Sequence, residues 1–91
     1  LGGAFVTSNR VSGEGRYDIQ LKPTQKGLPG ILIELKAEKN CSDERLKKLS
    51  ETALQQINDK KYETELTTAG VRTIYKYGVA FSGKKVEVTV G

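Results

Sequence analysis

The sequence predicts a single α/β domain in which a long helix packs on a mixed β-sheet. Two observations carry this prediction. Alternating runs at 17–21 and 31–37, joined by a connection rich in Pro and Gly, predict an antiparallel hairpin. Apolar residues at helical spacing between 46 and 57 predict an amphipathic helix. Further strand patterns follow the helix, so the helix connects strands of one sheet.

The segment before residue 31 is predicted to hold two strands. Residues 4–7 are a short strand candidate, whereas residues 8–15 are polar, contain two glycines and are predicted to form a loop. Strict alternation at 17–21 places Asp18 on the polar face of the second strand. Residues 22–30 contain both prolines and two glycines, which is typical of a hairpin connection.

The run at 31–37 is the most strand-like part of the chain, and we expect all of it to be deeply buried. Glu34 and Lys36 nevertheless fall on the same face of this strand. Burying isolated charges is costly, so these two side chains are expected to be paired, metal-bound or at an open edge. A cross-strand ion pair is the simplest explanation, and a catalytic site is the alternative.

The helix is predicted from its cap and its apolar stripe. Ser42 suits the N-cap, with two acidic residues in the first turn after it. The stripe consists of Leu46, Leu49, Ala53 and Ile57. At about 100° per residue, Gln56 lies at the edge of this stripe and Gln55 points to solvent. Gln56 therefore either binds main-chain groups at the interface or belongs to a polar cluster on the sheet.

The remaining elements are short. Residues 62–69 are predicted to form a short helical turn closed by Gly70. Strands are predicted at 73–81 and at 85–90, the latter with clean alternation. The aromatic side chains are expected to pack in the core and on the strands.

Composition excludes several chemistries. The 91 residues include no His and one Cys, so His-based triads, His-containing zinc sites, internal disulfides and Cys-cluster metal sites are excluded. The lone Cys41 suits a reducing cytoplasm, and its place beside the helix start predicts a somewhat lowered pKa. No apolar run approaches the roughly 20 residues needed to cross a bilayer. The chain starts at Leu1 rather than Met, and we expect it to be a piece of a larger protein.

The net charge of +4 is compatible with a nucleic-acid partner and equally with an ordinary small domain. The hairpin brings Asp18 toward Glu34, and two neighbouring carboxylates repel one another unless a cation lies between them. Mg²⁺ is the expected cation, because it takes one or two carboxylates and commonly meets phosphate. Lys36 would point to the same place, where it could orient the attacking water and stabilise charge on a phosphate.

Four segments together resemble the PD-(D/E)XK nuclease superfamily, and most closely the branch C-terminal to AAA-ATPase-like domains in prokaryotes. They are Ser8–Asp18, Ile31–Lys36, Ala53–Tyr62 and Tyr77–Phe81. The resemblance covers nearly the whole chain. It implies one nuclease-like domain over residues 1–91 with a restriction-endonuclease-like fold, whose first core helix is missing from this chain.

The resemblance also implies roles for individual residues. Asp18 and Glu34, with the Leu35 carbonyl, would bind Mg²⁺, and Lys36 would serve the attacking water. Gln56 and Tyr62 would correspond to the glutamine–tyrosine motif of the following helix.

The sequence departs from the family pattern at two of these positions. Tyr17 replaces the usual Pro before the Asp, and Tyr62 follows Gln56 by six residues rather than four. Arg10, Arg16 and Tyr62 are candidates for nucleic-acid contact.

The expected function is Mg²⁺-dependent hydrolysis of phosphodiester bonds, with DNA as the expected substrate. The alternative is an inactive nuclease-fold module that binds nucleic acid or protein beside an ATPase-like domain of the same parent chain. A purely structural domain is a third alternative. The sequence leaves open whether the substrate is DNA or RNA and whether the protein forms a homo-oligomer.

Overall fold

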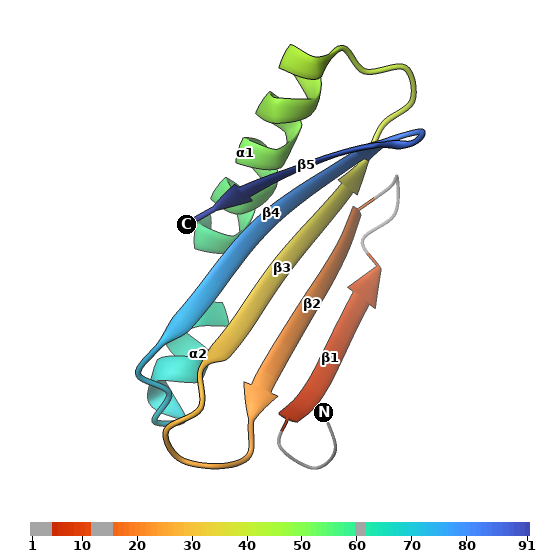
Figure 1. Ribbon diagram of the computed structural model, residues 1–91. Coiled ribbons are helices and arrows are strands. Elements are labelled where there is room, and N and C mark those ends of the chain that lie inside the picture. Colours follow the sequence, from red (N-terminus) through yellow and green to blue (C-terminus); the bar gives the residue numbers. More distant parts are fainter. Residues whose placement is uncertain (1–4, 12–15, 60–61) are drawn as a thin grey trace.

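The chain forms one five-stranded sheet with two helices on one of its faces (Figure 1). The computed structural model describes residues 5–11, 16–59 and 62–91, and the side chains of all these residues except 8–11, 16 and 59. The strands are β1 (Phe5–Val11), β2 (Arg16–Pro23), β3 (Gly30–Ala37), β4 (Ile74–Ser82) and β5 (Lys85–Val90). The helices are α1 (Asp43–Asp59) and α2 (Tyr62–Thr68). The prediction of an α/β mixed sheet with a long helix on it is confirmed.

Strand order in the sheet follows the chain, β1-β2-β3-β4-β5. β1, β2 and β3 pair antiparallel, β3 and β4 pair parallel across the helical connection, and β5 pairs antiparallel with β4. The parallel pair is where the two helices are needed, because parallel strands require a long crossover connection. The predicted antiparallel hairpin of β2 and β3 is therefore confirmed.

The largest boundary error concerns β1. The sequence predicts a loop from Ser8 onward, whereas the strand continues to Val11 and pairs with β2 as far as Tyr17. Polar residues are tolerated in this part of β1 because it is an edge strand, which pairs with β2 alone and is not enclosed between two neighbouring strands.

The start of α1 and the end of α2 lie where the sequence predicts them. At the start of α1, the Ser42 hydroxyl accepts a hydrogen bond of 3.1 Å from the Arg45 amide. At the end of α2, the Val71 amide bonds to the Leu66 carbonyl and the Gly70 amide to the Thr67 carbonyl, both at 3.0 Å. This is the Schellman arrangement, which needs the positive φ of 93° that Gly70 adopts. The predicted N-cap and glycine stop are confirmed.

The core lies between the helices and the sheet. One cluster consists of Leu32, Ile57, Leu66 and Val71, and a second of Cys41, Leu46, Leu49 and Ala80. The predicted apolar stripe of α1 is buried in full, with Ala53 completely enclosed. α1 packs on β3, β4 and β5.

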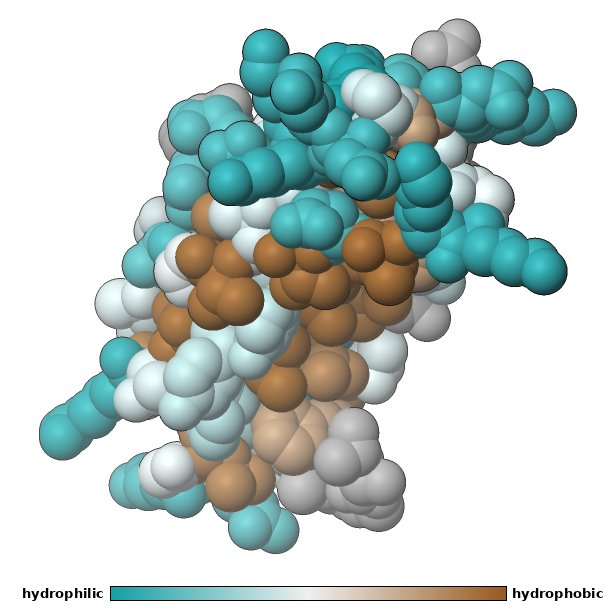
Figure 2. All heavy atoms as spheres, turned by 45° about the horizontal axis from the view of Figure 1, so that its top comes forward, coloured by the Kyte–Doolittle hydropathy of each residue, from teal (hydrophilic) through white to brown (hydrophobic). Residues whose placement is uncertain are grey.

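The other face of the sheet carries no covering layer among the described residues. Apolar side chains exposed by 40% to 65% gather there on β4 and β5; they are Tyr75, Phe81, Val86, Val88 and Val90. Figure 2 shows a continuous hydrophobic area bordered by hydrophilic side chains. On β3, Ile31, Ile33 and Leu35 are only half-buried. The expectation that the whole run is deeply buried is thus wrong for this face.

Candidate functional site

Asp18 and Glu34 stand directly opposite each other on the antiparallel strands β2 and β3. Directly opposed residues point to the same face of a sheet, with Cβ atoms about 4.5–5.5 Å apart. Both side chains are almost fully enclosed, with exposed fractions of 5% for Asp18 and 1% for Glu34. The fold therefore places two acidic side chains side by side in the interior, on the face that the helices cover.

The burial of Glu34 depends on its other neighbour, Gly78. Gly78 pairs with Glu34 across the parallel β3–β4 ladder. A Cβ atom on Gly78 would clash with the Ser50 carbonyl oxygen and lie 2.5 Å from the Leu54 amide nitrogen, both in the main chain of α1. The absence of a side chain lets the helix approach the strand beside Glu34. A single glycine inside a strand pattern, as Gly78 is in the run at 73–81, is the sequence signal for such a close approach.

Lys36 follows Glu34 by two residues on β3, so it points to the same face of the sheet. It is half-buried, whereas Ala37, which follows it, is exposed. Leu35, between the two charged residues, pairs with Tyr17 on β2 and with Val79 on β4. Lys36 thus lies two residues beyond the acidic pair on the same face, near the end of β3 that leads into α1.

Gln56 reaches this face of the sheet from α1. It is half-buried while Gln55 is exposed, which confirms the helical orientation that the apolar stripe predicted. The Oε1 atom of Gln56 is buried and accepts no hydrogen bond from any described residue. An amide oxygen in that position retains its full capacity to bind a donor or a cation.

The two carboxylates contribute oxygen atoms of the same kind. Oδ1 of Asp18 and Oε2 of Glu34 are buried atoms that no described hydrogen-bond donor contacts, although both residues take part in other interactions. Carboxylate and amide oxygens are ligands for hard cations such as Mg²⁺. The described residues hold no group of three or more acidic or Cys side chains suited to a metal. One or two carboxylates suffice for Mg²⁺, which keeps several waters, so the residues present fit this ion.

Tyr62, the first residue of α2, is tied to the acidic pair. Its hydroxyl donates a hydrogen bond of 3.3 Å to Oδ2 of Asp18, and its ring packs against the core cluster around Leu66. The sequence suggested Tyr62 as a nucleic-acid contact and gave no sign of a bond to Asp18. The two residues are 44 positions apart, and only the crossover connection brings them together.

The two arginine candidates for nucleic-acid contact lie on β1 and β2 beside the acidic pair and Lys36. Arg10 pairs with Asp18, and Arg16 with Lys36, through their main chains, but both arginine side chains lie outside the described residues. A further basic side chain, that of Lys22, is exposed near the end of β2 and shares the face of Asp18.

Cys41 belongs to a separate cluster at the start of α1. Its thiol donates to Oε2 of Glu38 at 3.0 Å, and Arg45 binds the same carboxylate through two nitrogens at 2.9 Å. The bond to Glu38 and burial together raise the pKa of the Cys41 thiol. The expected lowering is therefore wrong, because the nearest charge to the sulfur is negative and outweighs the helix start.

Comparison with known proteins identifies the family. A family model of the PD-(D/E)XK nuclease superfamily matches residues 1–90. Neither a curated protein nor a solved structure matches the chain. No helix in the described part of the chain combines the length and hydrophobicity required to cross a membrane. A match over nearly the full length, together with the mixed sheet, leads to one conclusion: the chain belongs to the PD-(D/E)XK nuclease superfamily.

Proposed function

We propose that residues 1–91 form one metal-dependent nuclease domain that hydrolyses phosphodiester bonds of DNA. The observation that carries this proposal is the placement of Asp18 directly opposite Glu34, both enclosed beneath the helices. The chain belongs to the PD-(D/E)XK nuclease superfamily, whose enzymes generally use divalent metals. Opposed buried carboxylates favour the retention of a catalytic metal site rather than a surface ion pair.

In this proposal Asp18, Glu34 and the Leu35 carbonyl hold Mg²⁺, which when bound supplies Lewis-acid stabilisation of a phosphate oxygen. Lys36 orients the attacking water and stabilises negative charge that develops on the phosphate. Gln56, on α1, orients the polar side chains of the site through hydrogen bonds from its amide group. Arg10 and Arg16 contact the nucleic-acid backbone, as does Lys22 on the open end of β2.

Cleavage of duplex DNA with and without Mg²⁺ tests the proposal. We expect Glu34→Ala and Lys36→Ala each to lower the cleavage rate by about 100-fold or more. Glu51→Ala and Lys48→Ala, which remove exposed charges from the outer side of α1, serve as matched controls and should cleave normally. Circular dichroism confirms that each variant is folded.

Two outcomes would overturn it. Equal cleavage by the Glu34 variant and the wild-type protein would remove Glu34 from the chemistry. DNA binding without any cleavage, unchanged by Mg²⁺ and by Glu34→Ala, would identify an inactive nuclease-fold module.

The resemblance of the four sequence segments alone supports a further part of the proposal. We propose that the domain follows an AAA-ATPase-like domain in the same parent chain, and that it acts in the cytoplasm of a prokaryote. The reading frame upstream of the codon for Leu1 tests this, because it must encode such a domain.

A further inference from the structure

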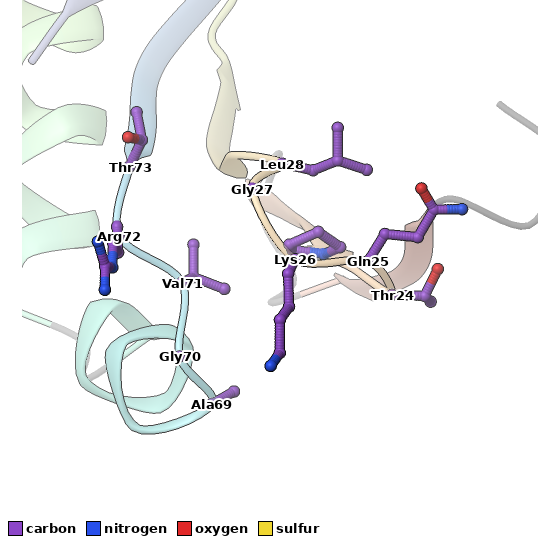
Figure 3. Close-up of a pocket in the computed structure, with 11 residues that line it drawn as sticks. Thr24, Gln25, Lys26, Gly27, Leu28, Ala69, Gly70, Val71, Arg72 and Thr73 are labelled. Atoms are coloured by element: carbon purple, nitrogen blue, oxygen red, sulfur yellow. The ribbon is translucent and has the colours of Figure 1, made fainter.

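Two basic side chains lie at the end of the sheet where β2 turns into β3. Residues 23–28 of this turn and residues 69–73, between α2 and β4, line a cavity of about 620 Å³. Figure 3 shows the two loops facing each other, with Lys26 extending between them toward Ala69 and Gly70. The cavity thus joins two segments that are separated by 40 residues of sequence.

The charged side chains that line this cavity are both cationic. They are Lys26 from one loop and Arg72 from the other, both exposed, and no acidic residue shares the lining. Neither cation forms an ion pair with a described residue. Glu63 lines the adjoining cavity beside Arg72, but its carboxylate binds Lys76 at 2.8 Å. Within the described part of the chain, the two loops therefore present two positive charges that form no ion pair with an acidic side chain.

A row of side chains on β2 connects this cavity with the acidic pair. Asp18, Gln20 and Lys22 lie two residues apart on the same face, and they are buried, half-buried and exposed in that order. α1 packs on β3, β4 and β5, and the exposed end of the row, Lys22, immediately precedes Pro23 in the cavity lining. At about 3.4 Å per residue, Pro23 at the cavity rim lies about 17 Å along the strand from Asp18.

We propose that Lys26 and Arg72 bind backbone phosphates of duplex DNA to one side of the bond that is cut. The inference rests on the proposed function, because it takes the acidic pair as the place of cleavage.

The exposure of both cations favours a polyanion over a small anion. A site for a single free phosphate needs converging, well-enclosed donors, whereas Lys26 and Arg72 are exposed and come from two separate loops. On a polyanion, each exposed cation contributes through the release of condensed counterions, which does not require enclosure. The contacts would fix the register of the duplex on the protein rather than read its sequence.

The test is to measure the binding of a 20-base-pair DNA duplex in metal-free buffer by fluorescence anisotropy at several salt concentrations. Metal-free conditions separate binding from cleavage. We expect Lys26→Ala/Arg72→Ala to weaken binding about tenfold or more at 0.1 M salt and to reduce the slope of log K against log salt by about 1.8, which is about 0.9 per lost contact. Lys26→Arg/Arg72→Lys should keep the wild-type slope.

Lys48→Ala/Lys84→Ala is the charge-matched control, because both lysines are exposed and lie in other elements, Lys48 in α1 and Lys84 in the turn between β4 and β5. Figure 1 shows the β4–β5 turn at the end of the sheet opposite the turn from β2 to β3. This control variant should leave the slope unchanged. In cleavage assays with Mg²⁺, the Lys26/Arg72 variant should raise KM and leave kcat unaltered. The inference is overturned if the Lys26/Arg72 variant has the same salt slope as the wild-type protein, or if the control variant lowers the slope by the same amount. Either result leaves the proposed nuclease activity intact. If the wild-type protein neither binds DNA in metal-free buffer nor cleaves it with Mg²⁺, both the inference and the proposed nuclease activity fail.

Discussion

Gly78 on β4 lies against the main chain of α1 so closely that a Cβ atom on it would clash with the carbonyl oxygen of Ser50. The same glycine pairs with Glu34. One position therefore fixes both how near the helix comes to the sheet and how deeply the glutamate is buried. A stability difference and a change in the site should consequently appear together when Gly78 is altered.

Gly78→Ala should lower the free energy of unfolding by about 1–3 kcal/mol or more, because a main-chain clash cannot be relieved by rotating a side chain. Urea denaturation measures this change. Gly83→Ala is the control: Gly83 has a positive φ of 60° but open space around it, so only the backbone strain of about 1–2 kcal/mol applies. A Gly78→Ala cost no greater than the control would contradict the close packing of α1 on β4.

Glu34→Gln should abolish stabilisation of the fold by divalent cations. Ligands that bind only the folded state raise its stability, so Mg²⁺ or Mn²⁺ should raise the Tm of the wild-type protein and leave that of the variant nearly unchanged. Without the cation, the variant should be as stable as wild type or more stable by about 0.2–1 kcal/mol, because like charges directly opposed on neighbouring strands repel. Differential scanning calorimetry measures both effects.

The matched control for that experiment is Glu51→Gln, an exposed position on α1. Its Tm should rise with the cation as much as that of the wild-type protein. A cation-dependent increase that survives in Glu34→Gln would place the metal elsewhere.

Tyr62→Phe should have a small effect on folding and a measurable one on the metal. The bond of 3.3 Å to Asp18 is longer than usual for a hydroxyl donor, so its loss should cost less than about 1 kcal/mol. Groups that orient a metal ligand nevertheless affect affinity, and we expect Mn²⁺ binding, followed by isothermal calorimetry, to weaken by up to about tenfold.

Leu66→Ala is the contrasting variant for Tyr62→Phe. It should destabilise the fold by about 2–5 kcal/mol, because Leu66 is completely buried in the cluster that Tyr62 packs against. If Tyr62→Phe matched that loss, or left metal affinity untouched, its hydroxyl would have no positioning role.

Glu38 should contribute to the acid dependence of stability. The bond from Arg45, and then that from the Cys41 thiol, lowers the pKa of this carboxyl from 4.5 to about 2. A depressed pKa in the folded state means that the stabilisation is present above pH 4.5 and is lost as the pH falls toward 2. The Tm difference between wild type and Glu38→Gln should therefore shrink over that interval. A difference that stays constant from pH 6 to pH 2 would show that the pair with Arg45 contributes nothing.

The sequence by itself determined the elements and the orientation of their faces. Alternation put Asp18 on the polar face of its strand, and the 100° helical repeat distinguished Gln56 from Gln55, because both periodicities are local properties of the backbone. Local pattern was also enough to place the Ser42 cap and the Gly70 stop. It was not enough at Ser8–Val11, where pairing with a neighbouring strand extends β1 through residues that resemble a loop.

Only the tertiary structure decided how these elements meet. The register that opposes Asp18 and Glu34, the approach of α1 over Gly78 and the bond from Tyr62 to Asp18 all join residues distant in sequence. So does the cavity between Lys26 and Arg72. Such contacts depend on how whole faces pack, and no local periodicity encodes which of the two faces of the sheet the helices will cover. The helices cover the face that holds the two acids and leave the purely apolar face of β4 and β5 open.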